Sequence, residues 1–156
     1  MTQGTSITIE DNMIQGILKK DIEIVTPYGK MKVAAVGRKS GYSFDFAYYE
    51  NGNLAIIWLR EEKTVFYDSM SITLPLFKPD QLLRIAFYDN FNIRSCRAVN
   101  SVTYLGYKLP ENTSLHFSDK GTLKSFTIFQ DWILEGVQYS DGQQFQIRDG
   151  KIVPWS

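Results

Sequence analysis

The stretch YYENGNLAIIW, residues 48–58, places an Asn-Gly pair between two tyrosines and an apolar run. Asn-Gly is a strong signal for a two-residue β-hairpin turn, because both central positions of such a turn need positive φ. Four other stretches run in the same order, with apolar alternation, a polar or acidic turn, and then Leu, Ile or Met. They are IEIVTPYGKMKV (22–33), IAFYDNFNIRSC (85–96), LHFSDKGTLKSF (115–126) and FQIRDGKIV (145–153). The sequence therefore predicts hairpin after hairpin.

The turns of these hairpins recur with a period near thirty residues. A second glycine, at position 16, 106 or 136, precedes three of the turns by 13 to 15 residues. Two signals in the same phase favour a true repeat over a plain meander with similar turns, and stacking buries the apolar face that a lone hairpin leaves exposed. The turn markers are Gly29, Gly52, Phe91, Gly121 and Gly150, at intervals of 23, 39, 30 and 29 residues.

These features predict one all-β domain spanning residues 1–156, with stacked antiparallel hairpins that form a meander, an open roll or a single-layer sheet. Helix is nearly absent, and the one candidate, at 75–85, lies between prolines inside the longest interval. That interval indicates an insertion at 68–81. The expected units lie near 6–34, 42–66, 82–100, 101–130 and 131–156.

A packing rule follows from comparing the units. Large apolar residues come two positions after each marker, and buried types come five positions after it, so a step of three interrupts strict alternation. A β-bulge in the outgoing strand of each unit restores the inward face. Phe91 replaces Gly in one turn, so either that turn has another geometry or packing holds Phe91 at positive φ. The inward positions are Met31, Leu54, Ile93, Leu123 and Ile152, followed by Ala34, Ile57, Cys96 and Phe126.

Composition excludes several classes of function. Lys and Arg balance Asp and Glu at 17 each, and no basic run is longer than two residues, which argues against nucleic acid as a partner. The longest apolar stretch is Leu54–Leu59, far too short for a membrane span. A lone cysteine forms no internal disulfide, which fits a cytoplasmic protein, although a removed signal peptide remains open. No cofactor motif is present.

Two groups of residues are candidates for a chemical site. Cys96 and His116 are the only thiol and the only imidazole, but alternation turns Cys96 inward and His116 outward, so a catalytic dyad is not expected. Acids recur at matching turn positions, a spacing that would stack them as in calcium-binding repeats, but side-chain hydrogen bonds to the turn backbone are the favoured explanation. We therefore expect no metal and no catalysis. The turn acids are Glu50, Asp89, Asp119 and Asp149.

The aromatic excess, 14% of residues, is the remaining clue to function. The second hairpin is apolar on both faces, which predicts either burial by a roll or a dimer, favoured here, or a surface that presents Tyr49, Ile56 and Trp58 to a partner. The fourth unit, with Lys124 and His116 outward, is expected to be solvated.

We expect a non-enzymatic binding protein that contacts another protein or a second copy of itself. The alternative is a small-molecule or lipid binder in which the 68–81 loop covers an aromatic pocket lined by Tyr48, Trp58 or Trp132. The candidate binding residues are Tyr49, Ile56, Trp58 and Trp132, and the candidate structural turns are Gly29, Gly52, Gly121 and Gly150.

The stretches YYENGNL, FYDNFNI and FSDKGTL, with their phased glycines, resemble the bacterial MORN-type repeat, in particular the MORN-variant units of YwqK-like proteins. The likeness extends from about Met13 to Val153. It implies a single-layer or rolled antiparallel sheet that binds proteins or lipid head groups without catalysis. The family has no catalytic residues to carry over to this chain.

Overall fold

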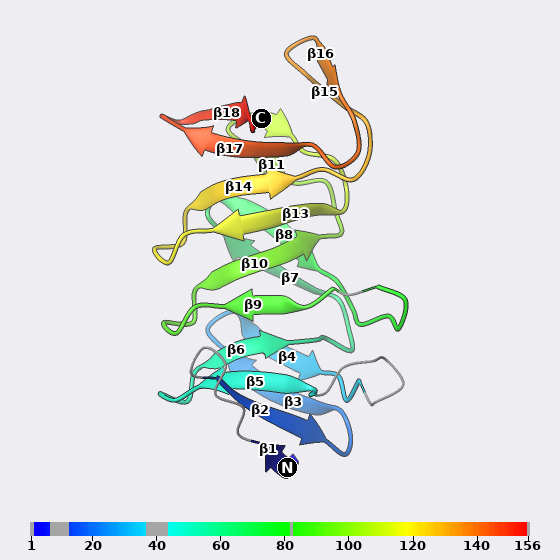
Figure 1. Ribbon diagram of the computed structural model, residues 1–156, viewed down its shortest axis with the longest axis vertical. Helices are drawn as coiled ribbons and strands as arrows, with labels where there is room; N and C mark the ends of the chain where they lie inside the picture. The colour runs from blue at the N-terminus through cyan, green and yellow to red at the C-terminus, as the bar shows by residue number, and fades with distance from the viewer. Residues whose placement is uncertain (1, 7–12, 37–43, 82, 156) are drawn as a thin grey trace.

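The computed structural model describes residues 2–6, 13–36, 44–81 and 83–155, and no residue in these ranges is helical. This confirms the all-β class. Ten strands form one antiparallel sheet, called the main sheet (Figure 1). Its strands in order are β1 (Thr2–Ser6), β2 (Met13–Leu18), β5 (Phe46–Tyr49), β6 (Leu54–Ile57), β9 (Ile85–Phe87), β10 (Ile93–Ala98), β13 (Thr113–Phe117), β14 (Leu123–Thr127), β17 (Gln144–Arg148) and β18 (Lys151–Pro154).

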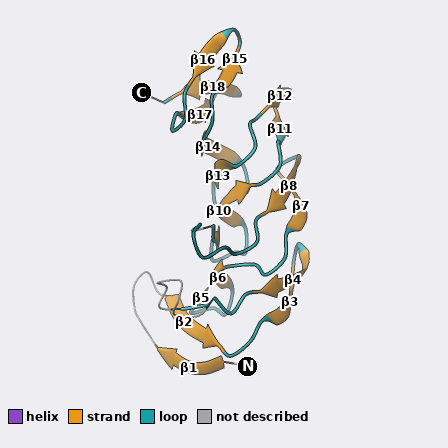
Figure 2. Cartoon of the chain, turned by 90° about the vertical axis from the view of Figure 1, so that its right-hand side faces the viewer, coloured by secondary structure: helices purple, strands orange, loops and turns teal. Residues whose placement is uncertain are grey.

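The remaining strands form four separate hairpins, which we call the second layer. In Figure 2 the first three lie along one side of the main sheet, and the last one projects beyond its C-terminal end. The chain alternates between the layers, placing one hairpin in the main sheet and the next behind it. We call the face of the main sheet turned away from the second layer the front face. The hairpins are β3 (Ile22–Thr26) with β4 (Gly29–Val33), β7 (Lys63–Tyr67) with β8 (Met70–Leu74), β11 (Thr103–Tyr104) with β12 (Tyr107–Lys108), and β15 (Trp132–Leu134) with β16 (Val137–Tyr139).

Turn chemistry alone does not reveal the layer of a hairpin. The turns at Gly52, Phe91, Gly121 and Gly150 lie in the main sheet, at its left edge in Figure 1. Gly29, predicted to share their phase, lies instead in the second layer, at the β3–β4 turn with φ 101°. Turns in both layers use positive φ, so the same residue type serves both. The predicted phase of the first unit is therefore wrong.

The predicted insertion at 68–81 is wrong for its first half. Asp68 and Ser69 form the β7–β8 turn with φ of 47° and 63°, and strand β8 follows. Met70, Ile72 and Leu74 alternate into the core and are at most 1% exposed. The β7–β8 turn contains no glycine, so the comparison of turn markers along the sequence did not find this hairpin. The second half of the predicted insertion connects β8 to β9 and packs against the main sheet, because the Phe77 amide donates to the Leu59 carbonyl.

The two layers enclose one apolar cluster, the interlayer core. Its large side chains include Phe87, Phe117, Phe126 and Phe145, each at most 1% exposed. The predicted inward row lies in this core as one continuous series, with its middle members fully buried and its outer members half-buried. The row comprises Leu54, Ile93, Leu123 and Ile152.

The predicted β-bulges occur in three hairpins of the main sheet. Register shifts leave an extra residue in β6, β10 and β14, namely Ala55, Arg94 and Lys124. The β3–β4 and β17–β18 pairs keep a regular register, so the prediction of a bulge there is wrong. Each bulge restores the inward face after the turn and leaves its extra residue on the front face.

Phe91 adopts the second of the two arrangements that the sequence left open, a positive φ held by packing. Its φ is 72°, in the left-handed region that bulky residues avoid. Its ring packs edge-on against Phe87, with 5.4 Å between the ring centroids, and its carbonyl accepts a 2.7 Å hydrogen bond from the Tyr28 hydroxyl of the second layer. Packing from both layers holds this turn in place.

A smaller cluster, the front core, covers the N-terminal part of the front face. Trp58 is fully buried in it and lies 5.5 Å from the Phe44 ring. Burial of the second hairpin on both faces is thus confirmed, but the cover is the chain's own segments around residues 34–36 and Phe77, instead of a roll or a dimer. The front core comprises Ala34, Val36, Ala47, Ala55, Ile56, Trp58 and Phe77.

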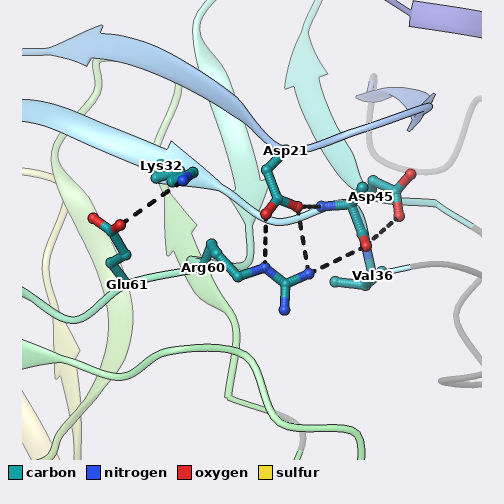
Figure 3. Close-up of polar contacts among 7 residues, drawn as sticks. Asp21, Lys32, Val36, Asp45, Arg60 and Glu61 are labelled. Carbon is teal, nitrogen blue, oxygen red and sulfur yellow. Dashed lines mark hydrogen bonds and ion pairs between the residues drawn. The ribbon is translucent and has the colours of Figure 1, made fainter.

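An ion pair joins the segments that cross between the layers (Figure 3). Arg60 Nε donates to Asp21 Oδ2 at 2.9 Å, and the Ala35 amide donates to Asp21 Oδ1 at 2.9 Å. Burial by itself raises the pKa of Asp21. The Ala35 amide and the Arg60 guanidinium outweigh it and hold that pKa below its ordinary value.

Asp45 holds two neighbouring segments that cross between the layers, also through hydrogen bonds from backbone amides. It is 2% exposed, and its two carboxylate oxygens accept hydrogen bonds from the backbone amides of Leu18 and, as Figure 3 shows, of Val36. A buried carboxylate is tolerable only with such donors. Asp45 therefore has a structural role at the edge of the front core.

Candidate functional site

The four predicted binding residues do not form one site. Trp58 is fully buried in the front core, whereas Ile56, also a front-core residue, lines a hollow of about 280 Å³ on the front face. Trp132 belongs to the C-terminal end of the interlayer core, packs edge-on against Phe145 at 5.3 Å, and donates from Nε1 to the Lys108 carbonyl. Tyr49 lines the same hollow as Ile56 and also a larger groove.

The thiol and the imidazole lie on opposite faces of the main sheet. Cys96 pairs across the strands with Leu115, while His116 pairs with Ser95. Burial in the interlayer core raises the pKa of the Cys96 thiol to about 12, which leaves no reactive thiolate near neutral pH. His116 is exposed on the front face. This placement agrees with the expectation from strand alternation that Cys96 and His116 do not act together.

The turns of the main sheet are linked by asparagines. Asn51 and Asn53 donate from Nδ2 to the Asp89 carbonyl at 2.9 and 2.6 Å. Asn90 and Asn92 repeat the pattern one unit later, donating to the Asp119 carbonyl at 2.8 Å each. The backbone of each acidic residue, not its carboxylate, thus takes part in the repeat. Among the residues that the structure describes, no cluster of three potential metal-binding side chains occurs.

A groove runs along the front face beside these turns. Its volume is about 810 Å³, and its lining mixes both signs of charge with two tyrosines. The Tyr49 and Tyr88 hydroxyls donate to carbonyls of the next hairpin, of Phe87 and Phe117, at 2.6 Å each. The charged residues that line the groove are Glu50, Asp89, Arg94, Asp119 and Lys124.

The outer face of the second layer, turned away from the main sheet, carries large apolar side chains. Val25, Phe66 and Ile133 are 80%, 81% and 65% exposed. Each is the second-last strand residue before the turn of its hairpin, so each occupies the same place in the repeat. The sequence analysis did not identify this surface, because it left open whether the hairpins form a meander, an open roll or a single layer. The outward alternation of Thr64 and Phe66 was the available signal.

An apolar cleft opens between the layers near the N-terminal end. Its volume is about 300 Å³, at the lower limit for ligand pockets. Tyr48 lines it, as the sequence comparison expected, but Trp58, Trp132 and the 68–81 segment do not. The other lining residues are Ile22, Ile24, Val33, Phe46, Gly52, Leu54 and Ile57.

Comparison with known proteins yields no relative: no family model, no curated protein and no solved structure matches this chain. Within the described ranges, no helix has the length and apolar character needed to cross a membrane. Function must therefore be argued from the surfaces themselves.

Proposed function

We propose that this chain is a non-enzymatic β-repeat interaction protein that binds a second copy of itself through the outer face of its second layer. The observation that carries the proposal is the exposure of Val25, Phe66 and Ile133 at one repeated position. An aromatic side chain that is 81% exposed in mid-strand is costly to leave in water, and such residues concentrate at protein interfaces.

A second copy is the partner that the spacing favours. Successive hairpins advance by two strands of the main sheet, so their outward positions recur about every 10 Å. The third hairpin has Thr103 at this position, between Phe66 and Ile133. Another copy turned by a two-fold axis presents a row with the same spacing, and such isologous contacts are the commonest in homo-oligomers. The MORN-type resemblance supports protein binding. The cytoplasmic location expected from the sequence belongs to the same proposal.

Strand addition at the C-terminal edge is a poorer route to association. The Trp155 amide bonds to the Gln144 carbonyl, and the Pro154–Phe145 pair is the next pair along the strands. Because pairs alternate in an antiparallel ladder, the nitrogen of Pro154 faces away from β17. Proline has no proton to donate there, which blunts this edge.

The test is sedimentation velocity over roughly two decades of concentration. We expect the unmodified chain to dimerise and Phe66→Ser to weaken dimerisation by about tenfold or more. Phe129→Ser is the matched control, because Phe129 is 40% exposed and lies against Arg97 of the front face. A chain that stays monomeric at every concentration, or equal weakening by both variants, would refute the proposal.

A second candidate function, binding of a small apolar ligand, is favoured by the interlayer cleft. Seven of its lining residues are apolar or aromatic, and Tyr48 is among them. Leu54→Trp would fill the cleft, whereas Leu105→Trp places the same indole on an exposed turn. Binding of a fluorescent apolar probe should be lost in the first variant and kept in the second. If the probe bound both variants equally, its binding site would lie outside the cleft, and this candidate function would be refuted.

A further inference from the structure

A hollow of about 570 Å³ lies on the front face over β10, β13 and β14. Three side chains that carry or can acquire positive charge line it, Arg94, His116 and Lys124, together with the Ser125 hydroxyl and the Tyr88 and Trp155 rings. No Asp or Glu is among the described residues of its lining. The hollow thus combines cationic, hydroxyl and aromatic groups in one concavity.

The strand register explains why these residues converge. His116 of β13 pairs with Ser95 on one side and with Ser125 on the other. Arg94 and Lys124 are the bulge residues of the flanking strands, each one step nearer the turns. Since β10 and β14 are two strands apart, about 10 Å, two long cationic side chains can reach a ligand of phosphate size held between them.

Arg94 is held in place before any ligand arrives. Its guanidinium carbon lies 4.7 Å above the centre of the Tyr88 ring, a cation–π contact that restricts the side chain. Tyr88 is itself fixed, because its hydroxyl donates to the Phe117 carbonyl of the neighbouring strand at 2.6 Å. The floor of the hollow is therefore preorganised.

The cations of the hollow have no carboxylate partner. In the described part of the chain, ion pairs join Lys30 to Glu23, Lys32 to Glu61 and Arg60 to Asp21, and none involves Arg94 or Lys124. The acids that face the same region line only the adjoining groove, which shares Arg94 and Lys124 with the hollow. Those acids are Glu50, Asp89 and Asp119.

We propose that this hollow binds a small soluble phosphate monoester, with the phosphate between Arg94, His116 and Lys124 and a ring of the ligand against Trp155. Guanidinium, imidazolium and ammonium groups are the donors that phosphate oxygens accept best. The half-exposed indole of Trp155 offers a stacking surface at the border of the hollow. The site is independent of the self-association proposed above.

His116 makes a direct test possible, because it is the only histidine in the chain. Its imidazole gives a single set of proton NMR signals, and partial desolvation lowers its pKa in the free protein. Adenosine monophosphate should shift these signals saturably and raise the pKa of His116. Inorganic phosphate should act more weakly, and adenosine should have no effect.

Matched lysine variants separate a site from general electrostatics. Lys124→Gln should weaken binding of adenosine monophosphate about tenfold, while Lys120→Gln, at the turn of the same hairpin but outside the hollow, should change it less than about twofold. Circular dichroism checks that both variants fold. No saturable shift, equal effects of the two variants, or binding only to vesicles that display phosphomonoester lipids would overturn the proposal.

Discussion

Strands β6 and β14 occupy the same place in two hairpins of one sheet, yet β6 is buried on both faces and β14 on one. Their inward residues correspond, with Leu54, Ile57 and Leu59 in β6 and its extension matching Leu123, Phe126 and Ile128. Their front residues differ, because Ala55, Ile56 and Trp58 face the front core whereas Lys124, Ser125 and Thr127 face solvent. One hairpin scaffold thus supports either a second core or an open polar surface.

The largest expected effect tests the double burial of β6. Trp58→Ala removes a fully buried indole from the front core and should lower the free energy of unfolding by about 3 to 5 kcal/mol. The half-buried Trp132 provides the comparison, and Trp132→Ala should cost about half as much. Urea denaturation followed by circular dichroism measures both. Equal losses of unfolding free energy would mean that the front core adds little to the stability of the N-terminal half.

The next effect concerns close packing in the N-terminal half. A Cβ added at Gly16 would lie 2.2 Å from Phe46 Cζ, so Gly16→Ala should destabilise by about 1 to 3 kcal/mol through overpacking. Phe46→Leu in the same background should recover part of the loss, as measured by thermal unfolding. A neutral Gly16→Ala would show that the Phe46 ring moves aside freely.

A smaller, pH-dependent effect is expected at the layer crossings. Asp21→Asn should cost about 1 kcal/mol at pH 7, since Arg60 is partly exposed. The folded pKa of Asp21 is depressed, so the stabilisation is complete above the unfolded pKa and is lost as the pH falls through the folded value. The gap to the unmodified chain should close below about pH 4.

The solvent-exposed ion pair between Lys32 and Glu61, at 3.8 Å, is the control for Asp21. Glu61→Gln should change the stability by less than about 0.5 kcal/mol at any pH. If both variants had the same pH profile in urea titrations, the Asp21 contacts would have no special role in holding the crossings together.

The smallest effect is expected at the asparagine links between turns. Asn92→Ala removes one exposed hydrogen bond to the Asp119 carbonyl and should cost about 0.5 to 1 kcal/mol. Lys120→Ala, at an exposed turn without such a bond, should be neutral. Hydrogen exchange at the β9–β10 and β13–β14 turns should show faster opening in the asparagine variant only.

The sequence predicted the inward residues better than the layers. Steps of two and five from each turn found Ile93, Cys96 and Phe126, because burial of one face fixes register strongly. The layer of Gly29 could not be predicted, since turns in both layers need the same positive φ. The cover over Trp58 depends on long-range contacts with Phe77 that no local pattern encodes.

The candidate sites were less accessible to sequence reasoning. Arg94 and Lys124 each stand three residues after a turn marker, so a full alignment of the units could have assigned them to the same position of two successive units. The hollow is lined by both Trp155 and His116, which are far apart in the chain, and this placement needs coordinates. The exposure of Val25 and Phe66 was not predicted, because apolar character alone does not tell which face of a strand is covered.

Alternation between the layers also restricts how such a chain can change in length. Each period of about thirty residues contains two hairpins, one for each layer. Loss or duplication of both together would leave every later strand on its proper side. Deletion of a single hairpin would move all later hairpins to the opposite layer and expose their apolar faces to water. Viable length variants of this chain should therefore differ by whole periods.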